Sequence, residues 1–245
     1  MDVTIDEDID RCHEFVVADL QTSGRVLWSV VNNAGVLTYG HLEWGEFDDF
    51  VKVYDVNVFG VVRVTRKFIP LIRETKGRIV IVASMGGRLA SDNLSAYCSS
   101  KAAIISVATV LRREMAKFGV RVSTIEPAFF KTGVYYAVVP SFEHNWVNTL
   151  DPIRQVYGDQ YFADQLAALK RRRRLSFGSK NLGTVVDAMV DAVRSRSPNR
   201  TYSPVNLWPL KVVPLVLPYI PQWVLDLGFR ELDSTKPAFV SQKAK

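Results

Sequence analysis

The chain has 245 residues, of which 48% are hydrophobic and 23% charged, and its formal net charge is +6. These totals fit one large α/β domain and exclude a chain too short to bury a core. Cys12 and Cys98 are the only cysteines, so we expect no disulfide framework and a reducing, intracellular compartment. The three histidines lack metal-ligand spacing, and no metal site is predicted.

Much of the positive charge lies in one run, residues 170–174. We expect this run to be a solvated helix face or loop, with contact to acidic lipid headgroups as the alternative. No nucleic-acid reader motif accompanies it, so no nucleic-acid partner is predicted. Acidic residues follow Met1 directly, where a signal peptide would carry basic and then apolar residues, so none is expected.

Helical and strand patterns alternate along most of the chain. Apolar residues recur at helical spacing over 4–20, 46–75, 95–118 and 182–194. Short apolar runs that end in turn residues predict strands at 26–31, 78–84, 121–126 and 200–204. Such alternation is typical of an α/β fold with a doubly wound parallel sheet.

The first helix has a predicted start and a predicted buried face. Thr4 and Glu7 have the spacing of a capping box, so this helix is expected to begin at Thr4. Ile5, Ile9 and Phe15 belong to the apolar stripe that should face the core.

Two segments depart from this alternation. Residues 128–181 look irregular and are rich in aromatic side chains. Residues 205–229, in a tail that extends to 245, are apolar but are interrupted by Lys211 and by four prolines. A spanning helix needs about 20 apolar residues without such breaks, so we expect a surface-lying segment or a lid that closes over substrate.

The stretch from Ser84 to Lys101 holds the strongest candidate site. Tyr97 and Lys101 are four residues apart, so a helix places them on one face. Ser84 ends the predicted strand at 78–84. Because ligands bind outside the carboxyl ends of the strands in an open parallel sheet, these three side chains should meet at one site.

The chain resembles the short-chain dehydrogenase/reductase family at independent points that keep the family's order and spacing. These points are 32–35, Asn57, Ser84, Tyr97, Lys101 and 127–132. Within the family it is most similar to the branch of retinol and hydroxysteroid dehydrogenases and D-β-hydroxybutyrate dehydrogenase, through 86–90, 97–101, 111–115, 126–130 and 200–204. The resemblance implies a Rossmann-like domain at 1–204, with 128–181 as an insertion that covers the substrate. The alternative for that insertion is an apolar subdomain that packs on itself.

The resemblance also implies a reaction, in which a hydride passes between an alcohol carbon and NAD or NADP. Tyr97 would be the general acid/base and Ser84 would bind the substrate oxygen. Lys101 would lower the pKa of Tyr97, because a nearby cation favours the phenolate, and would also bind the nicotinamide ribose. Asn57 would hold a water in a proton relay from Lys101.

The family likewise implies which residues contact the cofactor. They are Asp2, Asn33, Ala34, Gly35, Tyr97, Lys101, Pro127 and Thr132. The sequence contains no glycine-rich TGxxxGxG turn, which holds the pyrophosphate in the family. Asp2 to Thr4 matches the motif that follows the family's third strand, so we expect the first βαβαβ portion to be missing and the chain to bind neither NAD nor NADP with useful affinity. Strand 26–31 should then be an aggregation-prone sheet edge.

Substrate and partners remain open at the level of the sequence. The aromatic residues favour a small apolar alcohol or ketone such as a retinoid or steroid, with D-3-hydroxybutyrate as the alternative. A catalytically inactive fragment or isoform is the alternative from another class. Membrane-surface contact through 205–229 and homo-oligomerisation are further expectations, and the resemblance leaves the endoplasmic reticulum membrane surface and the mitochondrion as alternative locations.

Overall fold

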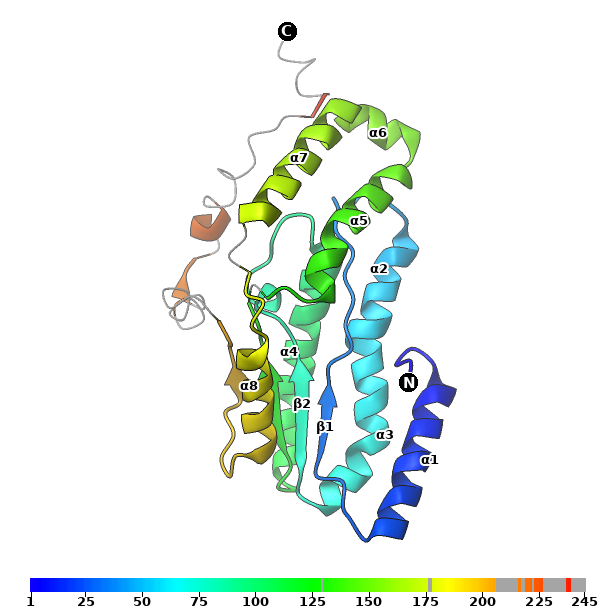
Figure 1. Ribbon diagram of the computed structural model, residues 1–245, viewed down its shortest axis with the longest axis vertical. Helices are drawn as coiled ribbons and strands as arrows, with labels where there is room; N and C mark the ends of the chain where they lie inside the picture. The colour runs from blue at the N-terminus through cyan, green and yellow to red at the C-terminus, as the bar shows by residue number, and fades with distance from the viewer. Residues whose placement is uncertain are drawn as a thin grey trace.

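The computed structural model describes residues 1–128, 130–175 and 178–205, with 216, 219–221, 223–226 and 237–238 from the tail (Figure 1). Its centre is a parallel sheet in the order β1-β2-β3-β4. The strands are β1 (Ser29–Asn32), β2 (Arg78–Val82), β3 (Arg121–Ile125) and β4 (Thr201–Tyr202). The predicted α/β class and parallel sheet are confirmed.

Helices cover both faces of this sheet, as a doubly wound fold requires. On one face, Ile79 and Ile81 of β2 pack against α3 (Val61–Glu74) and α4 (Ser95–Ala116). On the other face, Val80 and Val82 pack against α8 (Gly183–Arg194). Successive side chains of a strand point to opposite faces, so a strand buried on both faces is apolar throughout. This is why β2 reads as the continuous run RIVIV.

The first helix, α1 (Asp6–Ser23), begins later than the sequence predicted. The capping-box prediction was wrong, because the N-cap is Ile5 and no side chain caps the helix, while the Thr4 amide and hydroxyl both donate to Asp2 Oδ1, at 2.9 and 2.7 Å. The buried stripe was right for Ile9, which is 2% exposed, and wrong for Phe15, which is 74% exposed. Asp6, Glu7 and Asp8 in the first turn complement the helix dipole in place of a side-chain cap.

The helical stretch predicted at 46–75 changes from α-helical to π-helical hydrogen bonding in its middle, which the sequence did not predict. It is made of α2 (Phe47–Tyr54), the π-helical segment η1 (Asp55–Gly60) and α3. A π-helix bonds each amide to the carbonyl five residues back, and such segments occur frequently at functional sites. Asn57 lies inside η1 and is 1% exposed.

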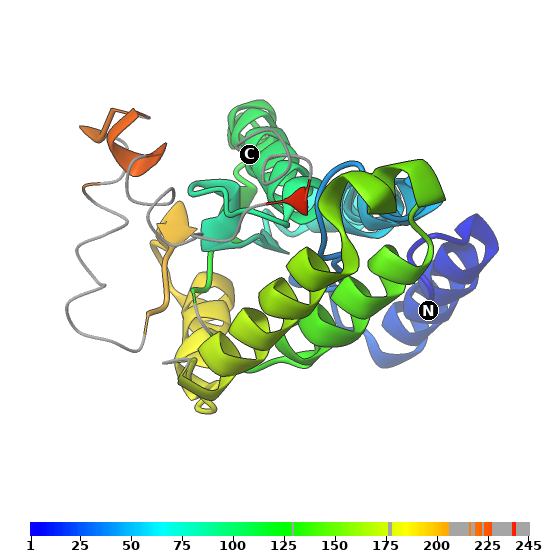
Figure 2. The ribbon, with the colours of Figure 1, turned by 90° about the horizontal axis from the view of Figure 1, so that it is seen from above.

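The prediction that 128–181 is irregular was wrong, because it forms α5 (Gly133–Val147), α6 (Asp151–Tyr157) and α7 (Asp159–Leu175). These helices lie beyond the carboxyl ends of the strands (Figures 1 and 2). Phe142, Trp146 and Tyr161 of these helices surround Trp44, which comes from the loop after β1. All four side chains are buried. Pro140 within α5 hid the helix from the sequence pattern.

Most of the tail lies outside the described residues, including 206–215 and 227–236. The prediction that 205–229 forms a surface-lying segment or a lid therefore stays a prediction. Within the described part of the chain, no helix has the length and apolar character that crossing a membrane requires.

Strand β1 lies at one edge of the described sheet, as predicted for this strand. Among the described residues it pairs with β2 alone, and its Val31 is 41% exposed. An apolar edge with unpaired backbone groups is a template for association with another chain.

We expect Val31→Lys to reduce self-association of the chain, because a charged side chain on an edge strand opposes pairing with a second strand. Val110→Lys is the matched control, since Val110 is 49% exposed but lies on α4, away from the edge. Sedimentation velocity at several protein concentrations would measure the effect. Equal association of Val31→Lys and the unmodified chain would contradict the expectation.

Candidate active site

Ser84, Tyr97 and Lys101 are brought together by the junction between β2 and α4. Strand β2 ends at Val82, and Ser84 then caps the short 3-10 turn η2 (Met85–Gly87) by accepting a hydrogen bond from Gly86 N at 3.1 Å. Gly87 lets this turn approach α4, since a Cβ there would lie 2.7 Å from the Lys101 carbonyl carbon. Helix α4 begins at Ser95, so Tyr97 and Lys101 fall in its first two turns.

The Ser84 hydroxyl and the Tyr97 ring lie on either side of Gly86, where a Cβ would be 3.4 Å from Ser84 Oγ and 3.5 Å from Tyr97 Cε1. Burial raises the pKa of Tyr97 above its ordinary value of 10.0, the Ser84 side chain offsets this in part, and Cys98 raises it further. The expectation that Lys101 would lower this pKa is therefore not met within the protein. The reason is distance as well as burial, because Lys101 Nζ lies 5.8 Å from the centroid of the Tyr97 ring.

Lys101 is a buried amine with spare hydrogen-bonding capacity. It is 4% exposed, and its Nζ donates to the Val82 carbonyl oxygen at 3.0 Å. In the part of the chain that the structure describes, this ammonium has no other hydrogen bond and no carboxylate partner. Burial lowers the pKa of Lys101 to about 8. An ammonium has three donors, so two remain for a bound molecule.

Asn57 of η1 is held on three sides by neutral groups. Its Oδ1 accepts from Val36 N at 2.9 Å, and its Nδ2 donates to Val36 O at 2.9 Å and to Ser100 Oγ at 3.0 Å. The sequence pattern singled out Asn57 but gave no signal for Ser100. These bonds fix the Asn57 side chain, and its role in holding a water for a proton relay stays a prediction.

Gly35 connects these residues to the loop that follows β1. A Cβ at Gly35 would lie 3.4 Å from both Asn57 Oδ1 and Lys101 Nζ. Glycine leaves that space free, and close approach of a ligand to this backbone stays a prediction. Asn33 and Ala34 are exposed at the end of β1, just before it.

Two pockets meet at Gly35 and Val36. The first, here called the N-terminal pocket, has a volume of about 650 Å³ and is lined by Asp2, Ala34 and Val51 among others. The Asp2 carboxylate accepts hydrogen bonds from the backbone amide and the hydroxyl of Thr4, and these lower its pKa.

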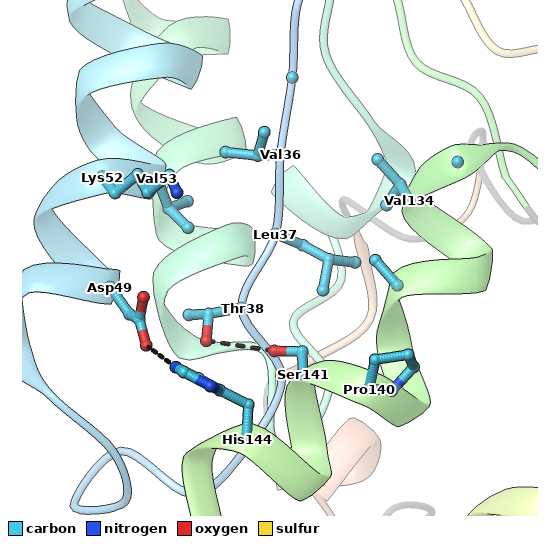
Figure 3. Close-up of a pocket in the computed structure, with 13 residues that line it drawn as sticks. Val36, Leu37, Thr38, Asp49, Lys52, Val53, Val134, Pro140, Ser141 and His144 are labelled. Carbon is cyan, nitrogen blue, oxygen red and sulfur yellow. Dashed lines mark hydrogen bonds and ion pairs between the residues drawn. The ribbon is translucent and has the colours of Figure 1, made fainter. Parts of the chain in front are cut away.

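The second, here called the α2–α5 pocket, has a volume of about 520 Å³ (Figure 3). Most of its wall is apolar, formed by Val36, Leu37, Val53, Val134, Ala137 and Pro140. Two polar pairs join its sides, His144 Nε2 to Asp49 Oδ2 at 3.3 Å and Thr38 Oγ1 to Ser141 Oγ at 3.4 Å. Ser84, Tyr97 and Lys101 do not line it, and Gly35 is the link between this pocket and the buried cluster.

An ion pair with one buried partner joins the turn beside Ser84 to the end of β3 and was missed at the level of the sequence. Arg88 donates from Nε and Nη2 to the two carboxylate oxygens of Glu126, each at 3.0 Å, and Glu126 is 2% exposed. The Glu126 side chain raises the pKa of Arg88. The pair joins η2 to the end of β3, as does the bond from Met85 N to Pro127 O at 3.1 Å.

Thr132, a predicted cofactor contact, is exposed and lies just before α5.

Comparison with known proteins gives a consistent result. The family model described as short chain dehydrogenase matches residues 1–140. Retinol dehydrogenase 16 of Rattus norvegicus is 37% identical over 234 residues, covering 94% of this chain and 71% of the relative. The 17-beta-hydroxysteroid dehydrogenase type 6 of Homo sapiens is 36% identical over 229 residues, covering 92% and 70%. The mitochondrial D-beta-hydroxybutyrate dehydrogenase of Bos taurus is 33% identical over 213 residues, covering 85% and 61%.

Solved structures share the fold. A short chain dehydrogenase from Burkholderia cenocepacia in complex with NADP has a TM-score of 0.66 at 18% identity, covering 94% of this chain and 76% of that one. A short chain dehydrogenase/reductase from Burkholderia phymatum in complex with NAD has a TM-score of 0.63 at 22% identity, covering 97% and 77%. At these identities the likeness concerns the fold alone.

Proposed function

Because the chain belongs to the short-chain dehydrogenase family, we propose that it carries the proton-transfer site of an oxidoreductase that interconverts an alcohol and its carbonyl compound. One observation supports this most strongly. Ser84 and Tyr97 lie together at Gly86, and a buried lysine with two unused donors lies one helical turn from Tyr97. Perturbed titratable groups that gather at the carboxyl end of a parallel sheet are typical of an active site.

Tyr97 is the general acid/base in this proposal. Its raised pKa keeps the phenol protonated at neutral pH, which suits proton donation to a carbonyl oxygen during reduction. Oxidation requires the phenolate, which burial of Tyr97 disfavours in the protein without its cofactor. Ser84 would hold the substrate oxygen beside the phenol, since its hydroxyl and the Tyr97 ring both lie beside Gly86.

NAD or NADP would supply or accept the hydride. The residues proposed to contact the nicotinamide ribose and the adenine end of this cofactor have the space and the hydrogen-bonding groups to do so. Gly35 leaves backbone space beside Lys101, whose free donors would bind ribose hydroxyls, and Asp2 and Ala34 line the N-terminal pocket. Pro127 and Thr132 remain proposed contacts for the nicotinamide end. The glycine-rich turn that would hold the pyrophosphate is not in the sequence.

For the substrate we favour a retinoid or steroid alcohol. The apolar wall of the α2–α5 pocket supports this choice, because burial of apolar area drives the binding of such molecules. D-3-hydroxybutyrate is the second candidate, since Lys52 in the same pocket would attract its carboxylate. A retinoid or steroid would bind mainly through the apolar wall of this pocket, whereas D-3-hydroxybutyrate would bind mainly through Lys52.

The substrate test is a comparison of initial rates. The full gene product is supplied with NAD or NADP and, in turn, all-trans-retinol, a 17β-hydroxysteroid and D-3-hydroxybutyrate, and reduced nicotinamide is followed by absorbance. The proposal predicts turnover of an apolar alcohol. Turnover of hydroxybutyrate alone would favour the second candidate, and loss of that activity in Lys52→Met would locate its carboxylate. Absence of turnover with all three, in folded protein that binds the cofactor, would favour the inactive isoform.

A further inference from the structure

Ser100 is a buried hydroxyl between the two proposed functional residues of α4. It is 0% exposed, and its Oγ donates to the Tyr97 carbonyl oxygen at 2.8 Å. The same oxygen accepts a hydrogen bond from Asn57 Nδ2 at 3.0 Å. Ser100 thus ties α4 to the π-helical segment η1. The neighbouring Ser99 makes no such link, since its hydroxyl donates to the Ser95 and Ala96 carbonyls of its own helix.

The link continues from Asn57 to the loop after β1. The amide of Asn57 forms two bonds to the backbone of Val36, one to its N–H and one to its carbonyl. Two antiparallel bonds between an amide and one peptide backbone fix both the distance and the orientation of that backbone. Val36 follows Gly35, whose missing Cβ would touch Lys101 Nζ. Ser100, Asn57 and Val36 therefore form one continuous path from α4 to the backbone that faces Lys101.

We propose that Ser100 is a positioning residue, which acts through Asn57 to hold the Gly35–Val36 backbone at its distance from Lys101. This inference rests on the proposed function only for its effect on turnover. Asn57 Nδ2 carries two N–H groups, and both are used, one by Val36 O and one by Ser100 Oγ. Without the Ser100 hydroxyl, one N–H is left buried and unpaired. The closed arrangement of Asn57 against Val36 is then less stable and opens more often, because an unpaired buried donor is costly.

The first test does not require activity. It compares hydrogen exchange of the Val36 amide, which donates to Asn57 Oδ1, in the unmodified protein, Ser100→Ala and Ser99→Ala. Loss of one buried hydrogen bond changes a local opening equilibrium by about tenfold, so Val36 should exchange about tenfold faster in Ser100→Ala. Ser99→Ala should leave the rate unchanged. Equal Val36 protection in both variants would overturn the proposal.

The second test concerns turnover. Ser100→Ala should lower kcat by about tenfold and leave KM for the alcohol unchanged, because a misplaced loop affects the reacting geometry more than substrate contacts. In an Asn57→Ala background, Ser100→Ala should have no further effect, since its route of action is already removed. Additive losses in the double variant would overturn the route through Asn57. A normal kcat in Ser100→Ala would overturn the positioning role.

A third variant covers the case in which Ser100→Ala folds poorly. Ser100→Cys fills the same space with a weaker hydrogen-bonding group. It should give Val36 exchange and kcat between those of the unmodified protein and Ser100→Ala. If the unmodified protein turns over no alcohol at all, the proposed function fails, while Val36 exchange still decides whether Ser100 holds Asn57.

Discussion

Tyr97→Phe should lower kcat by about 10²–10⁴-fold in the full gene product, the usual cost of losing a general acid/base. The phenylalanine ring keeps the packing of Tyr97 but has no proton to exchange with the substrate. Cofactor affinity should survive, because Lys101 and Gly35 are unchanged. Steady-state rates and calorimetric titration with the dinucleotide would measure the two effects separately.

Tyr136→Phe is the matched control for this substitution. Tyr136 is 52% exposed on α5, and its ring contact with Arg173 does not need the hydroxyl. Its kcat should stay within about twofold of the unmodified protein, since exposed substitutions away from a site have small effects. A Tyr97→Phe protein with near-normal kcat would remove Tyr97 from the proposed role.

Lys101→Met should raise the free energy of unfolding at pH 7 by about 2–3 kcal/mol while it abolishes most turnover. Burial lowers the pKa of Lys101 to about 8 from 10.5, so charging this amine opposes folding. Each pKa unit corresponds to about 1.4 kcal/mol, and loss of the bond to the Val82 carbonyl offsets part of the gain.

The stabilisation expected from Lys101→Met should depend on pH, because the pKa of Lys101 differs between the folded and the unfolded chain. Below pH 8, Lys101 is charged in both the folded and the unfolded chain, and the full cost of burying the charge is present. Between pH 8 and 10.5 the unfolded chain binds the proton more strongly, so stability rises with pH. The advantage of Lys101→Met should therefore shrink between pH 7 and 10.

Urea unfolding at both pH values, with the exposed Lys117→Met as control, would measure this difference. The control should change stability little and equally at the two pH values. A lower stability of Lys101→Met at pH 7, or a difference from the unmodified protein that does not change with pH, would contradict the expectation.

The sheet and the order of Ser84, Tyr97 and Lys101 could be predicted because each depends on local sequence. Strand β2 is apolar after Arg78 since both of its faces are buried, and α4 carries Tyr97 and Lys101 four residues apart. Side-chain contacts between distant segments could not be predicted. Ser100 meets Asn57 from 43 positions away, and no local pattern marks that meeting.

The remaining errors also have physical causes. Residues 128–181 looked irregular because their helices pack around Trp44, which lies far upstream in the sequence. The pKa of Tyr97 was expected to fall because sequence spacing shows the neighbouring cation but not the burial of the phenol. The start of α1 was misplaced because Thr4 forms local bonds with Asp2 through its amide and its hydroxyl, and the helix begins after Ile5.

Transfer of deuterium is the most direct test of whether Ser84, Tyr97 and Lys101 form a redox active site. The full gene product would be mixed with NAD or NADP and an apolar alcohol that carries deuterium on its carbinol carbon, and the nicotinamide product analysed by mass spectrometry. With the unmodified protein we expect deuterium in the reduced nicotinamide. With Tyr97→Phe we expect the transfer to be slower by about 10²-fold or more, the lower end of the effect of losing a general acid/base. Equal rates of transfer in the two proteins, or no transfer from a folded protein saturated with cofactor and alcohol, would contradict the assignment.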